Sequence, residues 1–203
     1  MSEPTKNIIS TINYNQEDII LDIINLHIPS KTIDIDPTFS KGNFYKSGKI
    51  PSPTLKFDLF PQTNETIASD AANLPIGGES VNSIMFDPPF IVGHTQKTTG
   101  IIATRFNSFR YIQDLWEWYD RCLIEFYRIL KKNGVLIFKC QDTVSSGKQW
   151  LSHVHIINEA EKLGFYSKDI FILLAKNRII GHNHRNQKHG RKFHSYFLVF
   201  EKH

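Results

Sequence analysis

The stretch Ser80–Phe90 (SVNSIMFDPPF) decides which fold we predict for this chain. Its first seven residues form a short apolar run of the length and composition of a buried strand. Pro88 and Pro89 end that strand, because proline has no backbone N–H for a sheet ladder and cannot continue as a helix. Asp87 therefore stands at the carboxyl end of a buried strand, next to two rigid residues and the ring of Phe90.

Strands and helices alternate on both sides of this stretch. Upstream, we expect a helix at residues 16–27 and short strands at 32–36, 54–58 and 66–69. Downstream, we expect a helix over 108–132 that ends at Asn133-Gly134, a strand at 135–140, a helix at 149–163 closed by Gly164, and strands at 166–175 and 194–201. This order predicts an α/β fold, with a Rossmann-like, doubly wound, mostly parallel sheet and an antiparallel C-terminal hairpin.

Acidic residues follow four of the expected strands. They are Asp36, Asp58, Asp70 and Asp87. In an open α/β sheet, ligands bind beyond the carboxyl ends of the strands, so these carboxylates are candidate ligand contacts. The alternative for each is an aspartate that caps the next turn.

Asp87 and its neighbours suit one kind of chemistry. The exocyclic amine of a nucleic-acid base needs hydrogen-bond acceptors for its N–H groups and an aromatic face on which the flipped base can stack. The Asp87 carboxylate and the Pro88 carbonyl supply acceptors, and Phe90 supplies the ring. An exposed turn is the alternative, since Asp-Pro-Pro also occurs in ordinary loops.

The segment Asp87-Pro88-Pro89-Phe90 resembles the catalytic motif Asp/Asn/Ser-Pro-Pro-aromatic of amino-methyltransferases. Over about residues 30–203 the layout is similar to small phage-type and bacterial DNA adenine-N6 methyltransferases, which have the class I methyltransferase fold. The runs Gly134–Asp142 (GVLIFKCQD) and Asn186–Lys202 also resemble family segments. The resemblance implies a site-specific, adenine-specific DNA methyltransferase that uses S-adenosyl-L-methionine, of the kind found in phages or restriction-modification systems.

The resemblance also implies site residues. We expect the catalytic group to comprise Asp87, Pro88, Pro89 and Phe90. We expect cofactor contacts from Asp36, Pro37, Thr38, Phe39, Gly42, Asp58, Asp70 and Ala71. The loop after Asp36 departs from the family pattern of two or three glycines, because Gly42 is its only one. Lys139, Gln141 and Asp142 are expected near the target base, without an assigned role.

Other functions remain open at this stage. The motif describes an amine and not a polymer, so RNA adenine-N6 and DNA cytosine-N4 methylation are alternatives. A non-catalytic methyltransferase-like module that binds nucleic acid is a third, favoured by the single glycine of the cofactor loop. The intact Asp-Pro-Pro-Phe sequence argues against it.

Length and composition indicate the number of domains, the state of the cysteines and the absence of a membrane segment. The 203 residues, 40% of them hydrophobic, fit a single domain over 1–203, with no room for a separate target-recognition domain. Cys122 and Cys140 match no metal or redox spacing and read as reduced, buried thiols. No apolar run is long enough for a membrane helix. We therefore expect a cytoplasmic protein without a membrane partner, either a monomer or a homodimer.

Four cations near the C-terminus are candidate nucleic-acid contacts. They are Arg185, Lys188, Arg191 and Lys192, in a chain of net charge +4. Such a cluster can hold phosphates, and a solvated loop is the alternative. His182 and His184 lie in the same region, but with no cysteine or carboxylate beside them we expect no metal site.

Overall fold

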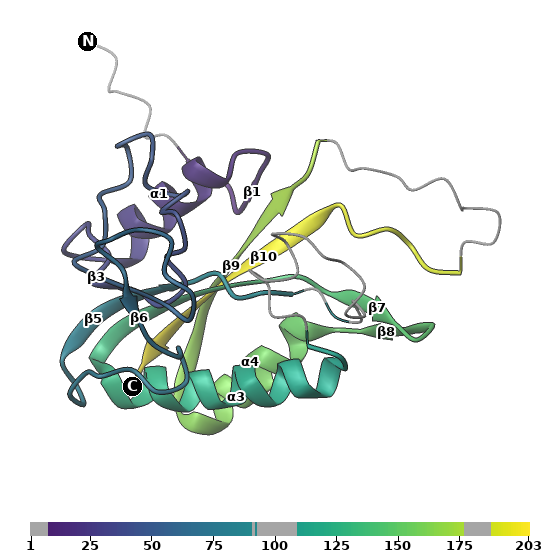
Figure 1. Cartoon of the computed structure of the whole chain (residues 1–203). Coiled ribbons are helices and arrows are strands. Elements are labelled where there is room, and N and C mark those ends of the chain that lie inside the picture. Colours follow the sequence, from purple (N-terminus) through teal and green to yellow (C-terminus); the bar gives the residue numbers. More distant parts are fainter. Residues whose placement is uncertain (1–7, 91, 93–108, 177–187) are drawn as a thin grey trace, which may run out of the picture.

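A computed structural model describes residues 8–90, 92, 109–176 and 188–203 and has an eight-stranded sheet at its centre (Figure 1). The strands are β1 (Ile12–Asn13), β2 (Ile35–Asp36), β3 (Leu55–Asp58), β4 (Ile67–Ala68), β5 (Val81–Phe86), β6 (Leu130–Cys140), β9 (Phe165–Leu174) and β10 (His194–Lys202). Their spatial order is β1-β9-β10-β6-β5-β2-β3-β4. All pairs are parallel except those of β10, which runs antiparallel between β6 and β9. The predicted α/β sheet with an antiparallel C-terminal hairpin is confirmed.

The chain order of the strands reverses between β2 and β5. From β2 the chain proceeds outward through β3 and β4, and it then returns to β5 on the other side of β2. Ile35 of β2 pairs directly with Ile84 of β5. Loops that leave adjacent strands at such a reversal point diverge and open a crevice at the carboxyl edge of the sheet. The segments after Asp36 and Asp87 are these two loops.

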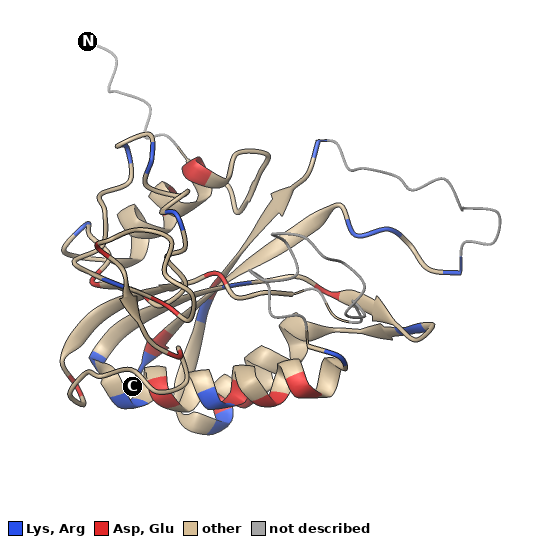
Figure 2. Cartoon of the chain, in the orientation of Figure 1, with Lys and Arg blue, Asp and Glu red and all other residues tan. Residues whose placement is uncertain are grey.

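Helices cover both faces of the sheet. On one face α1 (Gln16–His27) buries Ile19, Ile20, Ile23 and Ile24 against Val135, Ile137 and Val199, among others. The other face is covered by α3 (Ile112–Ile129) and α4 (Ser152–Leu163) (Figure 1). Charged residues recur along α3 (Figure 2), and the buried apolar side chains of this helix belong to the core beneath the sheet. The strands are therefore sandwiched, as their continuous apolar runs require.

One predicted boundary is wrong. Asn133-Gly134 does not end the long helix, because α3 stops at Ile129 and both residues lie within β6. They form a bulge: β5 pairs Val81 with Leu130 but Ser83 with Val135, so β6 contains extra residues there. Asn133 has a φ of 62°, and a Cβ on Gly134 would come within 2.8 Å of a backbone oxygen. A left-handed residue next to a glycine is typical of a helix end, but in this protein Asn133 and Gly134 form a strand bulge instead.

A second prediction fails at residues 143–150. The expected helix from Gln149 begins only at Ser152, after a hairpin of β7 (Thr143–Ser145) and β8 (Lys148–Trp150). Ser146 and Gly147 have φ values of 52° and 74°, as a tight hairpin turn requires. The C-terminal end of this helix is as predicted, because Gly164 closes it with a φ of 102°.

No helix within the described ranges is both long and apolar enough to cross a membrane.

Candidate active site

The loops after β2 and β5 are joined by the side chain of Thr38. Its hydroxyl accepts a hydrogen bond from the backbone N–H of Asp87 at 2.9 Å. It also lies 3.3 Å from Asp36 Oδ1, to which it donates. The loop predicted to hold a cofactor and the motif predicted to hold an amine are thus in direct contact.

Asp36 lies beneath this junction and is 1% exposed. Its carboxylate accepts hydrogen bonds from the Thr38 backbone N–H at 2.9 Å and from the Tyr45 hydroxyl at 2.8 Å. Burial raises the pKa of Asp36 to about 7, although these hydrogen bonds oppose the shift. The carboxylate of Asp36 thus binds residues of the loop after β2, and its role in this structure is to hold that loop in place.

Phe39 and Gly42 likewise shape the loop. The ring of Phe39 stacks on Tyr45, with 5.6 Å between centroids and 11° between planes. A Cβ on Gly42 would come within 2.6 Å of Phe39 Cζ, and the φ of Gly42 is 65°. Only glycine fits this close approach without displacing the ring. The single glycine of the loop thus has a packing role.

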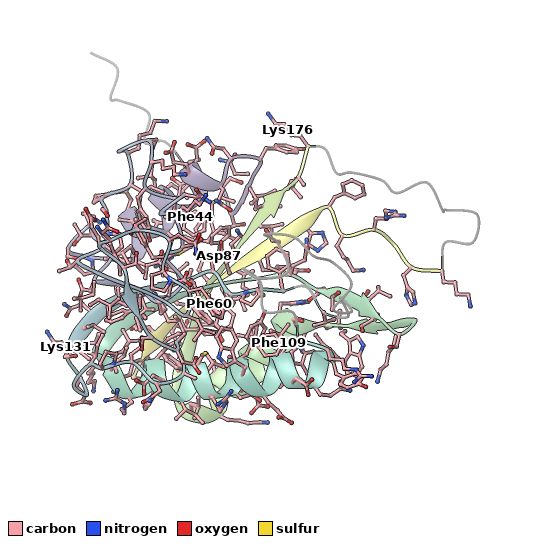
Figure 3. The ribbon with its side chains drawn as sticks, in the orientation of Figure 1. Phe44, Phe60, Asp87, Phe109, Lys131 and Lys176 are labelled. Atoms are coloured by element: carbon pink, nitrogen blue, oxygen red, sulfur yellow. The ribbon has the colours of Figure 1, made fainter. Side chains whose placement is uncertain are left out.

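A pocket of about 380 Å³ opens beside these loops, within the usual range for small-molecule sites. Its lining comes from the loop after β2 (Pro37, Thr38, Ser40, Asn43), the loop after β3 (Asp58, Leu59, Phe60, Gln62), the loop after β4 (Asp70, Ala71), the loop after β5 (Asp87, Pro89), and from Phe109 and Trp118. Phe60, Asp87 and Phe109, which belong to this lining, are labelled in Figure 3. Five of the eight predicted cofactor residues line this pocket, together with two of the four predicted catalytic residues.

The carboxylates of Asp58 and Asp70 are held by three backbone N–H groups and one indole N–H. Asp58 accepts hydrogen bonds from the N–H groups of Ser40 and Phe60, both at 2.8 Å. Asp70 Oδ1 accepts from the N–H of Ala72 and from Trp118 Nε1, both at 3.0 Å. Each aspartate therefore shapes a turn and also faces the pocket. The two interpretations of a strand-end aspartate, a ligand contact and a turn cap, are therefore compatible for Asp58 and Asp70.

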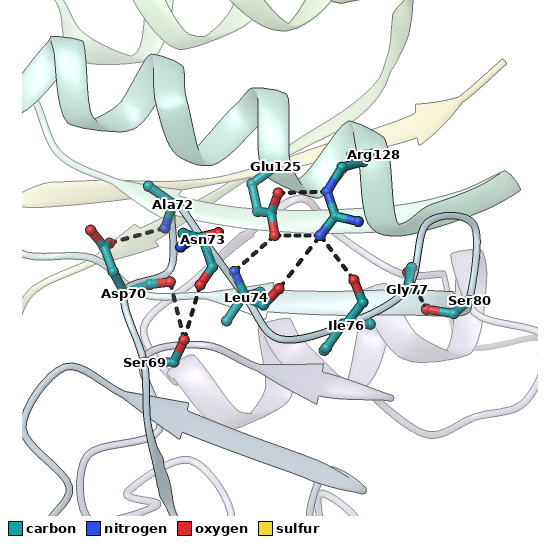
Figure 4. A network of polar contacts seen from close by, with 10 residues as sticks. All are labelled: Ser69, Asp70, Ala72, Asn73, Leu74, Ile76, Gly77, Ser80, Glu125 and Arg128. Atoms are coloured by element: carbon teal, nitrogen blue, oxygen red, sulfur yellow. Dashed lines mark hydrogen bonds and ion pairs between the residues drawn. The ribbon is translucent and has the colours of Figure 1, made fainter.

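A network of polar contacts fixes the loop that carries Asp70 (Figure 4). Glu125 Oε1 on α3 accepts from the Leu74 backbone N–H at 2.8 Å and from Arg128 at 2.7 Å. Arg128 in turn donates to the Ile76 carbonyl at 2.9 Å. Leu74 is buried in the core and does not line the pocket. The loop is thus anchored to the helix below it, which holds Asp70 in place.

The Asp87 motif is held from two sides. Lys139 Nζ on β6 lies 3.2 Å from Asp87 Oδ1 and 3.3 Å from Oδ2. Tyr119 on α3, which is fully buried, donates its hydroxyl to the Pro89 carbonyl at 2.6 Å. Pro88 is buried and Phe90 is half-buried. The backbone and the carboxylate of the motif are therefore both fixed before any ligand binds.

The described part of the basic segment, residues 188–193, leaves from the same edge of the sheet as Asp87. β9 runs parallel to β5 and β6, so its carboxyl end and the start of β10 lie at that edge. Lys188 and Arg191 are exposed and Lys192 is half-buried. His189 Nε2 lies 2.9 Å from the Gly147 carbonyl, so the segment contacts the β7–β8 hairpin. Arg185, like the histidines at 182 and 184, lies outside the described residues.

Several pocket residues were missed from the sequence. Trp118 packs against the core, and in addition its indole N–H binds Asp70 and it lines the pocket. Phe60 and Phe109 were not singled out, although a phenylalanine two residues after the strand-end Asp58 was an available signal. Within the described ranges, no group of three or more histidine, cysteine or carboxylate side chains is arranged to hold a metal ion.

Solved structures similar to this one include several methyltransferases. TrmN from Thermus thermophilus matches with a TM-score of 0.53 at 13% identity, over 92% of this chain and 48% of that one. TTHA0409, a putative DNA modification methylase from the same organism, matches with a TM-score of 0.45 at 21% identity, over 66% of this chain and 52% of that one. The cytosine-N4-specific PvuII DNA methyltransferase has a TM-score of 0.47 at 12% identity, over 66% and 48%. This chain thus spans about half the length of TTHA0409.

At the level of sequence, no curated protein matches the chain. The sequence model of a DNA methylase family, the N6/N4 methyltransferases, matches residues 81–203, which begin at β5 and include the Asp87 motif. That match covers more than half of the 203 residues. The chain belongs to the N6/N4 methyltransferase family of DNA methylases.

Proposed function

We propose that this protein transfers a methyl group from S-adenosyl-L-methionine to the exocyclic N6 amine of adenine in DNA. The observation that carries the proposal is the position of Asp87. Its carboxylate lies at the reversal point of the sheet and lines the same pocket as Asp58 and Asp70. One pocket therefore offers an acceptor for a target amine and further acceptors for a cofactor.

The pocket residues fit S-adenosyl-L-methionine, the methyl donor of this family. Trp118 and Phe60 offer aromatic faces for a purine ring. Asp58 suits the ribose hydroxyls or the methionine ammonium, and Asp70 suits the adenine amine. The backbone N–H of Ala71 suits adenine N1. When bound, the cofactor supplies an electrophilic methyl group on a positively charged sulfur, which keeps the bonding electrons as a neutral thioether.

The residues of the motif prepare the amine for this methyl group. Neutral adenine N6 is a poor nucleophile, because its lone pair is delocalised into the ring. Hydrogen bonds from N6–H to the Asp87 carboxylate and the Pro88 carbonyl favour a pyramidal nitrogen with a directed lone pair. The nitrogen forms one N–C bond and gives up one proton, which passes through Asp87 to water at the open side of the pocket. Such fixed acceptors contribute most where charge develops in the transition state.

Adenine is proposed over cytosine on the identity of the motif's first residue. Aspartate there resembles adenine-N6 enzymes, whereas serine is more typical of cytosine-N4 enzymes. Phe90, with the proline pair before it, offers the face on which a flipped base would stack. DNA is proposed over RNA on the membership of the chain in a DNA methylase family.

The basic segment is proposed as a phosphate contact. Lys188, Arg191 and Lys192 leave the same sheet edge as Asp87, so they can hold phosphates beside a flipped base. Arg185 completes the proposed set. Recognition of the DNA sequence is proposed to come from loops at this edge or from a second copy of the chain.

Two measurements test the proposal. Calorimetry should show binding of S-adenosyl-L-methionine, which a non-catalytic module without a working cofactor loop would lack. Incubation with a cofactor that carries a labelled methyl group should then label duplex DNA but not matched RNA. Labelling of RNA alone would reassign the substrate, and binding without labelling of either polymer would leave a non-catalytic module.

A further inference from the structure

We propose that Lys139 is a positioning residue for Asp87, which orients its carboxylate, offsets its charge and thereby sets the preference of the pocket between a sulfonium cofactor and a neutral thioether. This inference rests on the proposed function, because it assigns a role to Asp87 within methyl transfer. It concerns a residue that lines no part of the described pocket.

The geometry places the ammonium group against both carboxylate oxygens. Lys139 Nζ is 3.2 Å from Oδ1 and 3.3 Å from Oδ2 of Asp87. β5 and β6 run parallel with Phe86 opposite Phe138, and Asp87 is the first residue after β5, while Lys139 is the next residue of β6. The register of two central strands thus places the lysine beside the first residue of the loop after β5.

The side chain of Lys139 is largely buried and lies between Asp87 and two aromatic rings. Its side chain is 11% exposed, against 27% for that of Asp87. Two aromatic rings lie next to its ammonium: Phe44 at 5.2 Å and Phe197 at 5.7 Å from the centroids. Phe44 lies close to Asp87 in Figure 3. Cation–π contacts of this kind hold an ammonium in place where water is largely excluded.

A pair in this position acts differently from a surface ion pair. Removing one partner leaves the other charge in a poorly solvated place, where it acts strongly on whatever binds nearby. A carboxylate oxygen has more than one acceptor direction, so the lysine contact leaves room for an N–H of the target amine. Lys139 thus holds the acceptor without occupying all of it.

The consequence concerns the two forms of the cofactor. S-adenosyl-L-methionine carries a positive sulfur, whereas the product S-adenosyl-L-homocysteine does not. Because reacting atoms approach to about 3 Å, that sulfur must bind near the carboxylate that holds the amine. With Lys139 present, the pair is close to neutral and favours neither form strongly. Without it, the bare carboxylate favours the cation.

The test measures the ratio of the two dissociation constants in the full-length protein by calorimetry. Lys139→Met should favour S-adenosyl-L-methionine over S-adenosyl-L-homocysteine by about fivefold or more relative to wild type. Asp87→Asn, which leaves the lysine unpaired, should shift the ratio in the opposite direction. The double variant should return towards wild type, and Lys139→Arg should keep the wild-type ratio.

Turnover supplies a second readout. Lys139→Met should lower kcat and change the KM for DNA much less, and Lys139→Arg should restore much of kcat. Unchanged cofactor ratios in both single variants would overturn the inference, even where kcat falls. If Lys139→Met does not fold, an unchanged ratio in Asp87→Asn overturns it alone. Failure of the wild-type protein to bind either ligand would instead refute the proposed function.

Discussion

The hydroxyl of Thr38 accepts a hydrogen bond from the backbone N–H of Asp87 at 2.9 Å and lies 3.3 Å from the buried carboxylate of Asp36. This contact joins the loop after β2 to the motif after β5. We therefore expect a change in the first loop to alter the position of the acceptor in the second.

Thr38→Val tests this connection, because valine keeps the shape of threonine but cannot accept the Asp87 N–H. We expect kcat to fall by about tenfold, the equivalent of one lost hydrogen bond of about 1.4 kcal/mol. Cofactor affinity should change less. Thr54→Val, at an exposed threonine outside the pocket, is the matched control and should retain wild-type kcat. Equal rates for both variants would show that the contact does not position Asp87.

The raised pKa of Asp36, about 7, makes stability depend on pH. Between about pH 4, the unfolded value, and pH 7 the folded state binds a proton that the unfolded state has lost. The free energy of unfolding should therefore fall as pH rises through this window, by at most about 1.4 kcal/mol per pH unit, and level off above pH 7. Asp36→Asn should flatten this slope. Urea unfolding at pH 5, 6, 7 and 8 measures it, and parallel curves for both proteins would contradict the assignment.

Asp70 and Trp118 should act together on cofactor affinity. Asp70→Ala removes a pocket carboxylate and should weaken S-adenosyl-L-methionine binding by about 1 to 2 kcal/mol. Trp118→Phe keeps an aromatic ring but loses the indole N–H that holds Asp70 Oδ1, so a smaller loss is expected. In a thermal-shift titration the two effects should not add, since both act through one carboxylate. Wild-type affinity in Asp70→Ala would leave Asp70 as a turn cap only.

The basic segment should contribute to DNA binding through phosphates. Replacing Arg191 and Lys192 with alanine should weaken binding and reduce the slope of log affinity against log salt by about 0.7 to 0.9 for each lost contact. Cofactor affinity should not change. Lys131 and Lys132, which are exposed at the start of β6, are the matched control. Lys176 follows β9 at the sheet edge of the basic segment, and Lys131 lies on the opposite side of the molecule from it (Figure 3). Fluorescence anisotropy at several salt concentrations gives both slopes, and equal slopes for the two double variants would place the DNA elsewhere.

Periodicity predicted most of the sheet and the helices. The isoleucines of α1 and the apolar run before Asp87 depend only on local spacing, and both elements lie where that spacing places them. Asn133-Gly134 was misread because a left-handed residue followed by glycine suits a helix end and a strand bulge equally well. Only the pairing of β6 with β5 distinguishes the two.

The site was predictable where it follows from topology alone. Strand-end aspartates such as Asp58 and Asp70 converge because parallel strands end at one edge. The contacts from α3 were not predictable, since Trp118 reaches Asp70, and Tyr119 reaches the Pro89 carbonyl, from a helix dozens of residues away. The contact between Lys139 and Asp87 depends on the register between two strands, which no local pattern in the sequence contains.

The central claim is that Asp87 holds an adenine amine for methylation. The most direct measurement is mass spectrometry of nucleosides from duplex DNA incubated with S-adenosyl-L-methionine and either wild-type protein or Asp87→Ala. We predict N6-methyladenine with the wild type, a loss of about 10²-fold or more in the variant, and cofactor binding retained in both. N4-methylcytosine as the product, no methylated nucleoside at all, or near-wild-type turnover in Asp87→Ala would contradict the account.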